Sequence, residues 1–504
     1  MTKNYLGSAL LSYARANEEA PFATLADGSV VTNADLLQLS GKFANALLAF
    51  GVKPGDRVAV QVEKSFSALA LYLATIRSGA IFLPLNTAYT AAEIEYFLGD
   101  AAPALFICDT ASKEAYLPIA EATGTELATL DASGQRGSFF EQASPCSAIF
   151  EDQSRTADDL VAILYTSGTT GRSKGAMITG HNLLSNAEAL VEAWRIQSSD
   201  ILLHALPIFH AHGLFVGINT ILVAGAKLIF LPKFDGDQVI GLLPRATMFM
   251  GVPTFYTRLL QHEALRESAR NIRLFVSGSA PLLDETHRQF SAITGHAILE
   301  RYGMTETGMN TSNPYDSERR PGSVGFPLPG VEIRIADDAG PVKDGEIGVI
   351  EIRGPNVFKG YWQMPEKTAS EFRADGFFIS GDLAKRDADG YIHIVGRAKD
   401  LVISGGYNVY PKEVESEVDE IDGVVESAVI GIPHPDFGEA VTAVIVLENG
   451  ANLSVEEIRA HLKTRLATYK QPKKLIIVDE LPRNTMGKVQ KAELRARYGD
   501  QFKA

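Results

Sequence analysis

Short apolar runs that alternate with amphipathic helical segments constrain the fold of this 504-residue chain more than any other feature. Between residue 1 and about residue 150, a helical pattern from Ala34 to Phe50 precedes an apolar run over Arg57–Val62, and similar pairs follow. The alternation resumes between about residues 200 and 310, with runs such as Ile201–Leu206. Alternation of this kind predicts parallel α/β sheets, because a crossover between parallel strands needs a helix. We therefore expect two α/β halves packed together.

The pattern changes twice in the last third of the chain. Glycine and proline become dense between Gly322 and Tyr361, around alternating strands, which predicts a small β-rich subdomain. Beyond residue 396, two helical and three strand patterns predict a compact α+β domain. The predicted fold is α/β: a large N-terminal domain over residues 1–396, containing two α/β subdomains and the β-rich subdomain, and a small mobile α+β domain over residues 397–504.

Composition excludes several classes of protein. The formal net charge of −14 argues against nucleic acid or an anionic membrane as the main partner. The two cysteines, Cys108 and Cys146, form no metal-ligand cluster, and the first residues lack the apolar core of a signal peptide. No apolar run reaches the length of a membrane span. We expect a cytoplasmic protein that acts on small molecules.

The segment Tyr165–Gly175 is dense in hydroxyl residues and glycines, which donate hydrogen bonds and let backbone amides approach a ligand. An apolar run, Leu160–Leu164, precedes it, and a helical pattern from Asn182 to Ala193 follows. Strand, loop and helix in this order predict a cradle for polyphosphate oxygens, although the spacing differs from that of a Walker loop. A solvated surface loop is the alternative. The candidate ligands are Thr166, Ser167, Gly168, Thr169, Thr170, Gly171 and Lys174.

A second segment, Glu300–Gly308, combines three kinds of chemistry within a few residues. Tyr302 offers a ring that can stack on a purine, Thr305 a hydroxyl and Glu306 a carboxylate. Magnesium prefers one or two carboxylates together with substrate phosphates, so Glu306 beside a phosphate loop predicts a Mg²⁺ site, with Thr166 as its second residue. An exposed turn is the alternative.

The motifs, taken together and in order, resemble the adenylate-forming superfamily of acyl-CoA synthetases, peptide-synthetase adenylation domains and luciferases. The matching segments are Tyr165–Gly175, Phe209–Leu214, Val276–Pro281, Glu300–Gly308, Ile379–Leu383, Gly396–Glu415 and Leu481–Lys491. The resemblance implies two half-reactions: a carboxylate and ATP give acyl-AMP and pyrophosphate, and a thiol then displaces AMP. ATP, Mg²⁺ and coenzyme A are therefore the implied cofactors and co-substrate.

The resemblance assigns roles to residues that would be uninformative alone. His210 matches the histidine beside the acyl pocket, and Gly278 and Ser279 belong to the turn along the adenine and the acyl group. Asp382 and Arg397 match the residues that contact the ribose.

The same resemblance implies that the C-terminal domain rotates between the two half-reactions. Lys399 occupies the hinge position, and Gly405 and Gly406 the loop used in the thioester step. Lys488 matches the catalytic lysine, whose ammonium stabilises the negative charge that develops when a carboxylate attacks the α-phosphate. Superfamily members are often switched off by acylation of this lysine, so a lysine acetyltransferase and a deacetylase are further partners to expect.

Arg258 points to the substrate. It lies one helical turn beyond Thr254, in the segment that builds the acyl pocket of the superfamily. An unpaired arginine there would cost on the order of 3–5 kcal/mol, and a substrate with a second carboxylate would pair it. The surroundings resemble malonyl-CoA and methylmalonyl-CoA synthetases, which implies that Arg258 and Ser279 hold the distal carboxylate and that Met304 limits the α-substituent. A surface salt bridge is the alternative for Arg258.

We therefore expect ATP-dependent, AMP-forming ligation of malonate, and of methylmalonate, to coenzyme A. A CoA ligase for a monocarboxylate or a hydroxycinnamate would show no preference for diacids. An adenylation module for a carrier protein would ignore free coenzyme A. A non-catalytic homologue would lack Lys488, Glu306 or Asp382, and all three are present.

Overall fold

The computed structural model describes residues 4–166, 173–451, 453–484 and 487–502. Its first sheet has six strands in the order β6-β5-β3-β4-β7-β8, parallel throughout except between β7 and β8. The strands are β3 (Arg57–Gln61), β4 (Ile81–Pro84), β5 (Leu105–Cys108), β6 (Glu126–Thr129), β7 (Leu160–Thr166) and β8 (Lys174–Thr179). The accompanying helices are α1 (Tyr5–Leu10), α2 (Ser12–Ala16), α3 (Asn33–Ala49), α4 (Phe66–Arg77), α5 (Ala91–Ala101), α6 (Lys113–Thr123) and α7 (Ser138–Ala143). The predicted α/β alternation of this half is confirmed.

Strand β8 was not predicted from the sequence. The helix predicted over Asn182–Ala193 is observed as α8 (Gly180–Ala193), but β8 precedes it and pairs antiparallel with β7. Ala176 and Ile178 are buried in this strand, at 0% and 4% exposure. β7 and β8 are therefore paired neighbours in the sheet, and α8 begins only at Gly180.

The second sheet has nine strands in the order β15-β14-β13-β12-β11-β9-β10-β1-β2. These are β1 (Pro21–Leu25), β2 (Val30–Thr32), β9 (Ile201–His204), β10 (Lys227–Phe230), β11 (Met248–Gly251), β12 (Leu274–Ser277), β13 (Leu299–Met304), β14 (Gly308–Ser312) and β15 (Phe326–Pro327). Its helices are α8, α9 (Asn219–Ala224), α10 (Gly236–Leu242), α11 (Pro253–Leu259), α12 (Leu265–Ser268) and α13 (Asp284–Thr294), and a π-helical segment covers His212–Ile218. The strands from β1 to β13 along this order are parallel, as predicted for the second half.

Local signals explain where several helices begin. Thr32, Thr90 and Ser454 each form a capping box with the acidic residue three positions later, which satisfies otherwise unpaired amides of the first turn.

One continuous apolar core joins the two α/β halves. Within it the buried Tyr72 hydroxyl donates to Asn219 Oδ1 at 3.0 Å, which connects α4 to α9.

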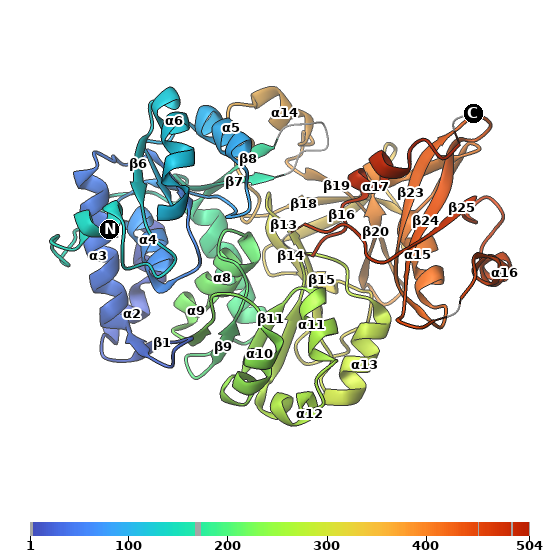
Figure 1. Cartoon of the computed structure of the whole chain (residues 1–504), viewed down its shortest axis with the longest axis horizontal. Helices are drawn as coiled ribbons and strands as arrows, with labels where there is room; N and C mark the ends of the chain where they lie inside the picture. The colour runs from blue at the N-terminus through green and yellow to red at the C-terminus, as the bar shows by residue number, and fades with distance from the viewer. Residues whose placement is uncertain (1–3, 167–172, 452, 485–486, 503–504) are drawn as a thin grey trace.

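A third, five-stranded antiparallel sheet forms the predicted β-rich subdomain, in the order β17-β16-β18-β19-β20. Its strands are β16 (Glu332–Asp337), β17 (Gly340–Pro341), β18 (Gly348–Arg353), β19 (Phe378–Arg386) and β20 (Ile392–Arg397), and α14 (Pro365–Ser370) lies between β18 and β19 in the chain. Figure 1 shows this sheet between the N-terminal helices and the C-terminal domain.

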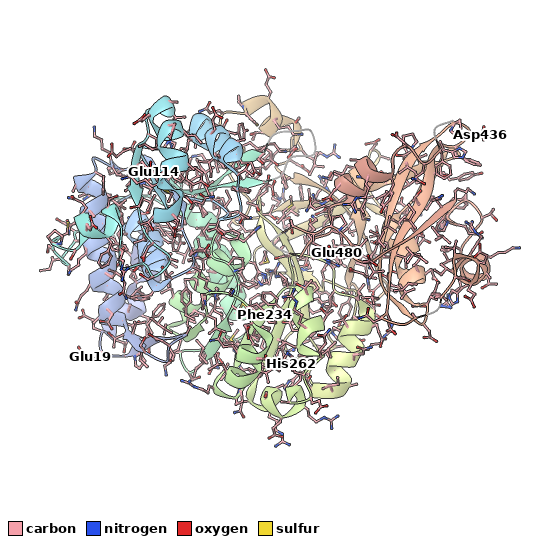
Figure 2. All side chains as sticks on the ribbon, in the orientation of Figure 1. Glu19, Glu114, Phe234, His262, Asp436 and Glu480 are labelled. Carbon is pink, nitrogen blue, oxygen red and sulfur yellow. The ribbon has the colours of Figure 1, made fainter. Side chains whose placement is uncertain are left out.

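The C-terminal part is the predicted α+β domain, with its own sheet and core. It contains β21 (Val402–Ser404), β22 (Tyr407–Val409), α15 (Pro411–Asp419), β23 (Val424–His434), β24 (Gly438–Leu447), α16 (Val455–Arg465), β25 (Lys474–Val478) and α17 (Lys491–Tyr498). The chain enters it over Ala398–Asp400, and the boundary at residue 397 stays a prediction. Glu480, labelled in Figure 2, marks the segment after β25 that returns toward β13 and β14. None of the described helices has the length and apolar character needed to cross a membrane.

Candidate active site

Three side chains predicted to contact the nucleotide form one hydrogen-bonded cluster. Asp382 and Arg397 stand opposite each other in the antiparallel pair of β19 and β20, which brings their side chains together. Arg397 Nε lies 2.8 Å from Asp382 Oδ1, and the Tyr302 hydroxyl donates to Asp382 Oδ2 at 2.7 Å. Burial and the charge of Asp382 raise the pKa of Tyr302, so the phenol keeps its proton and remains a donor.

Glu306, the predicted magnesium residue, lies beside the end of β7. Thr166 Oγ1 donates to Glu306 Oε1 at 3.3 Å, and the Tyr361 hydroxyl lies 3.2 Å from the same oxygen. Burial raises the pKa of Glu306. Among the described residues no group of three or more His, Cys, Asp or Glu could hold a metal ion. A single carboxylate with a neighbouring hydroxyl fits a magnesium ion whose other ligands are nucleotide phosphates and water.

Lys174 lies at the far end of the hydroxyl-rich loop, opposite Thr166 in the pairing of β7 with β8. Its Nζ is 3.3 Å from Glu371 Oε1 and 4.1 Å from the centre of the Tyr361 ring. The Tyr361 hydroxyl also donates to Glu371 Oε2 at 2.7 Å. The predicted ligands Ser167, Gly168, Thr169, Thr170 and Gly171 lie outside the described residues.

The acid side of the site contains a cation whose donors are not satisfied. Arg301 on β13 is 5% exposed, and its Nε and Nη2 have no hydrogen-bond partner among the described residues. The guanidinium lies against Gly278, where a Cβ would come within 2.3 Å of Arg301 Cζ, so only glycine leaves room for it. Burial lowers the pKa of Arg301 to about 9, which leaves it charged at neutral pH.

His212 and Ser279 complete this acid side. His212 Nδ1 lies 3.1 Å from Ser279 Oγ, and Ser279 has a left-handed backbone with φ of 73°. A non-glycine residue in that region stores strain and is found most often at functional sites. Burial and the charge of Arg301 lower the pKa of His212, which is therefore neutral, and its buried Nε2 has no partner among the described residues. We call Gly278, Ser279, His212 and Arg301 the acid pocket.

The other predicted acid-binding residues lie around this pocket. His210 lies just before the π-helix, and its carbonyl accepts a hydrogen bond from the Leu214 amide at 2.9 Å. Burial lowers the pKa of the His210 imidazole to about 4. Met304 and Thr305 are half-buried at the end of β13. Arg258 on α11 is exposed rather than enclosed by the pocket, and its role stays a prediction.

Lys488 comes from the C-terminal domain to the nucleotide cluster. The segment that carries it packs on the N-terminus of α11, where Gly487 is so close that a Cβ would lie 3.2 Å from Thr254. Burial and the charge of Arg397 lower the pKa of Lys488 to about 8, and Asp382, Lys399 and Asp400 also act on it. The predicted catalytic lysine and the predicted ribose residues are therefore assembled together.

The residues predicted for domain rotation and thioester formation lie on the C-terminal side. Lys399 is in the short turn Ala398–Asp400 between the third sheet and the C-terminal sheet. Gly405 and Gly406 form the exposed turn between β21 and β22, with φ of 60° and 83°, which favours glycine at both positions. Their roles stay predictions.

Sequence reasoning missed Arg301, His212, Tyr361 and Glu371. Arg301 is adjacent to Tyr302 on a buried strand, and a charged residue in such a strand is the signal that could have found it. The segment Phe209–Leu214 contains both His210 and His212, but only His210 was chosen. Tyr361 and Glu371 lie between β18 and β19 and carry no local signal, because their partners Glu306 and Lys174 are distant in sequence.

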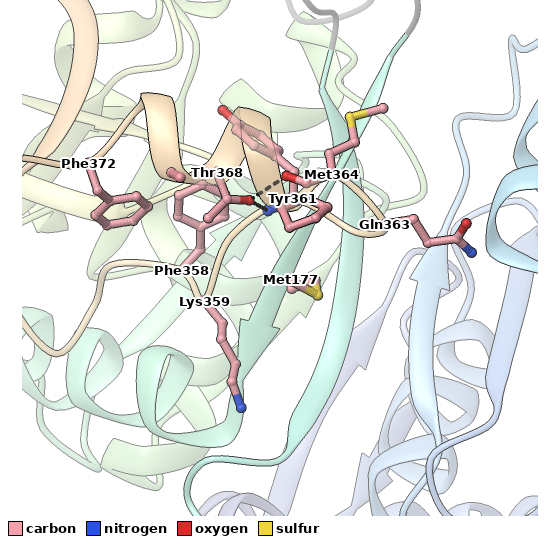
Figure 3. Close-up of a pocket in the computed structure, with 10 residues that line it drawn as sticks. Met177, Phe358, Lys359, Tyr361, Gln363, Met364, Thr368 and Phe372 are labelled. Atoms are coloured by element: carbon pink, nitrogen blue, oxygen red, sulfur yellow. Dashed lines mark hydrogen bonds between the residues drawn. The ribbon is translucent and has the colours of Figure 1, made fainter.

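Tyr361 also borders an apolar cavity of about 620 Å³, shown in Figure 3. Met177, Phe358, Met364 and Phe372 are among its lining residues, and the Tyr361 amide donates to Thr368 Oγ1 at 2.9 Å. The cavity contains neither the acid pocket nor the nucleotide cluster, so the candidate chemistry lies elsewhere.

Two family models match the chain: that of the AMP-binding enzymes over residues 12–362, and that of their C-terminal domain over residues 413–488. The chain belongs to the AMP-binding enzyme family. The domain arrangement described above is that of an AMP-binding enzyme, and it confirms the predicted superfamily.

Several AMP-binding enzymes are similar over almost the whole chain. The crystal structure of ATP-bound MatB from Rhodopseudomonas palustris is 56% identical, with a TM-score of 0.97 over 99% of this chain and 100% of that one. A malonate–CoA ligase of Arabidopsis thaliana is 37% identical over 90% of this chain and 79% of its own length. A feruloyl-CoA synthase of an Amycolatopsis species is 36% identical over 99% of this chain and 100% of its own length.

Proposed function

We propose that this protein is an ATP-dependent, AMP-forming malonate–CoA ligase that also accepts methylmalonate. The observation that carries the proposal is the buried Arg301 guanidinium, whose Nε and Nη2 have no hydrogen-bond partner in the described part of the chain and which lies against Gly278 near His212 and Ser279. A buried cation without a partner costs roughly 3–5 kcal/mol, and the second carboxylate of a diacid is the group that would remove this cost. The similarity to a malonate–CoA ligase supports the same substrate class.

The feruloyl-CoA synthase is almost as similar in sequence as the malonate–CoA ligase, so overall identity does not separate a diacid from an aromatic acid. The chemistry of the acid pocket favours a diacid over an aromatic acid, because an aromatic acid offers no second anion to Arg301. In the proposal, Ser279 and His212 assist Arg301, Arg258 lies at the rim, His210 borders the reacting carboxylate and Met304 limits the α-substituent.

In the first half-reaction a malonate carboxylate oxygen attacks the α-phosphorus of ATP and pyrophosphate leaves. The Lys488 ammonium stabilises the negative charge that builds up, while Asp382 and Arg397 hold the ribose. Thr166 and Glu306 would hold a magnesium ion, which neutralises phosphate charge when bound. In the proposal, Lys174 and the hydroxyls of Ser167, Thr169 and Thr170 bind phosphate oxygens.

In the second half-reaction the coenzyme A sulfur attacks the acyl carbon, the thiol loses its proton and AMP leaves. We propose that residues 397–504 rotate about Lys399 between the two steps and bring Gly405 and Gly406 to the site. Further parts of the proposal are that the enzyme works in the cytoplasm and that acylation of Lys488 by a lysine acetyltransferase, reversed by a deacetylase, switches it off. Acylation would remove the charge that the first step needs.

The function is tested by AMP formation from ATP, magnesium and coenzyme A with malonate, methylmalonate, succinate, acetate, propionate and a hydroxycinnamate. We expect strong turnover with malonate and methylmalonate, and little with succinate, whose carboxylates are farther apart. Preferential turnover of propionate or of the hydroxycinnamate would contradict the diacid assignment and leave only the family reaction.

The role of Lys488 is tested by separating the half-reactions. Lys488→Ala should lower the rate of malonyl-AMP formation on the order of 10²–10³-fold, the usual cost of one group that stabilises transition-state charge. Thioester formation from preformed malonyl-AMP should be retained. An equal loss in both steps would show that Lys488 is not specific to adenylation.

A further inference from the structure

A buried lysine and a buried histidine connect the first sheet to the acid pocket. Lys64 lies in the connection between β3 and α4, and His204 ends β9 of the second sheet. Both side chains are almost fully buried, with Lys64 8% and His204 1% exposed. Neither belongs to a motif that the proposed reaction uses, so their contacts need another explanation.

The contacts of Lys64 fix the His204 ring. Lys64 Nζ lies 2.7 Å from His204 Nδ1 and donates to the His204 carbonyl at 2.9 Å. The same ammonium lies 4.4 Å from the centre of the Phe230 ring, on which the imidazole stacks. His204 Nε2 faces the Gly213 carbonyl, which only accepts, so the ring proton is on Nε2. Burial lowers the pKa of His204, so the ring is neutral and its Nδ1 accepts from Lys64.

That Nε2 proton is directed to the π-helix. His204 Nε2 lies 2.8 Å from the Gly213 carbonyl oxygen, in the first turn of the segment His212–Ile218. The ring also fills the space beside Gly217, where a Cβ would come within 2.8 Å of Nε2. A π-helix is a rare, strained arrangement found most often at functional sites, and it needs contacts of this kind to persist.

We propose that Lys64 and His204 are positioning residues for the carboxylic acid substrate. The hydrogen-bonded path Lys64–His204–Gly213 holds the first turn of the π-helix where His212 meets Ser279. This inference rests on the proposed function only in that the acid pocket binds the substrate acid. It predicts that the path affects the acid and leaves ATP binding unchanged, because the path ends at His212 and Ser279, whereas the Asp382–Arg397 pair lies on β19 and β20.

The first test is Lys64→Met, which keeps the length of the side chain and removes its donors. Losing a donor to a buried acceptor is expected to raise the malonate KM about tenfold or more, with the ATP KM unchanged. The matched control is Arg77→Met, which removes another buried cation at the other end of α4, where Arg77 pairs with Asp152 at 2.8 Å. The control should lower the melting temperature without changing the malonate KM.

A second pair of variants keeps the inference testable if Lys64→Met does not fold. In His204→Gln the amide nitrogen takes the place of Nε2 and can still donate to Gly213, whereas His204→Asn keeps only a group near Nδ1. We expect His204→Gln to retain a malonate KM several-fold lower than that of His204→Asn.

Two results would overturn the inference. One is a malonate KM that stays unchanged in Lys64→Met, or that changes together with the ATP KM. The other is equal malonate KM values for the two His204 variants. If the wild-type protein uses a different acid, the proposed function is wrong, and the same comparison with that acid decides the role of Lys64 and His204.

Discussion

The nucleotide side and the acid side of the site treat charge in opposite ways. On the nucleotide side the charges are paired within the protein: Asp382 binds Arg397 and Tyr302, and Lys174 binds Glu371. On the acid side Arg301 is buried, and its Nε and Nη2 have no partner among the described residues. ATP must therefore compete with existing partners, whereas a diacid meets a cation that is already desolvated.

This difference suggests where selectivity originates. Where the protein groups already pair with one another, a ligand breaks these hydrogen bonds as it forms its own. The net binding free energy is then the small difference between the two sets of contacts. A buried unpaired cation carries its desolvation cost before the substrate arrives, and any acid without a second anion leaves that cost in place. The proposed selectivity for diacids thus needs no more than Arg301 and the residues that hold it in position.

Arg301→Met gives the largest expected effect on this comparison. Removing the buried partner of a carboxylate typically costs 2–5 kcal/mol, so kcat/KM for malonate should fall on the order of 10²–10³-fold. The free energy of unfolding should rise, because an unpaired buried charge is replaced by an apolar side chain. Kinetics with malonate and propionate, together with urea denaturation, would measure both.

Arg273→Met is the matched control for that variant. Arg273 precedes the neighbouring strand β12 and pairs with buried Asp200 at 2.6 Å, so its removal leaves a buried carboxylate with less compensation. It should destabilise the protein and leave acid selectivity intact. If Arg301→Met were destabilising in the same way, Arg301 would have a partner in the protein, and the comparison would be wrong.

Asp382→Ala should lower the free energy of unfolding, whereas Arg301→Met should raise it. It leaves Arg397 and the buried Tyr302 hydroxyl without their acceptor, but Arg397 is 31% exposed and water can solvate it in part. We expect the free energy of unfolding to fall by about 1–3 kcal/mol, and the KM for ATP to rise more than that for malonate. Unchanged stability would show that the pair contributes nothing to the ligand-free protein.

The sequence predicted the paired side of the site better than the unpaired side, and the reason is physical. Asp382 and Arg397 occur in recognisable segments and meet through simple strand pairing. Glu306 and Thr166, both named from the sequence, are hydrogen-bonded although they are far apart in the chain, and their shared role in binding magnesium stays a prediction. Arg301 was overlooked in favour of Arg258, because spacing within one helix cannot show which arginine is buried.

The fold was predicted for a similar reason wherever local patterns decide it. The β-rich subdomain and the C-terminal α+β domain are observed where their strand patterns and turns predict them. Strand β8 was missed because it directly follows the hydroxyl-rich loop, and its pairing with β7 is a tertiary property. The π-helix His212–Ile218 was also missed, because its contacts with His204 involve a separate strand.

A change of pH should act on the two sides differently. Adenylation needs Lys488 as a cation, and the lowered pKa of about 8 means that the cation is lost as pH rises through 8. Above that pH, kcat/KM for malonyl-AMP formation should fall about tenfold per pH unit, whereas Arg301, with a pKa of about 9, stays charged longer. A guanidinium loses its proton at a higher pH than an ammonium in the same place, so Lys488→Arg should move the decline of any remaining activity to higher pH.

The measurement is the pH profile of malonyl-AMP formation, compared with that of thioester formation from malonyl-AMP. Arg397, Asp382, Lys399 and Asp400 act on Lys488, so a shift of the midpoint in Asp382→Ala toward lower pH would fit the loss of a stabilising anion. A profile without a decline between pH 7.5 and 9.5, probed with buffers of constant ionic strength, would show that deprotonation of Lys488 does not limit the first step.

The smallest expected effect belongs to Arg258→Ala. Arg258 is exposed in the ligand-free protein, so solvent screens its charge, and an exposed ion pair contributes about 0.2–1 kcal/mol. The malonate KM should rise roughly two- to fivefold, less at high salt, with no change for propionate. Arg266→Ala, which removes an exposed arginine of α12, is the control and should change neither. Equal losses for malonate and propionate would contradict a role in diacid recognition. A loss larger than that of Arg301→Met would reverse the comparison, because the second carboxylate would then bind at the exposed rim rather than at the buried cation.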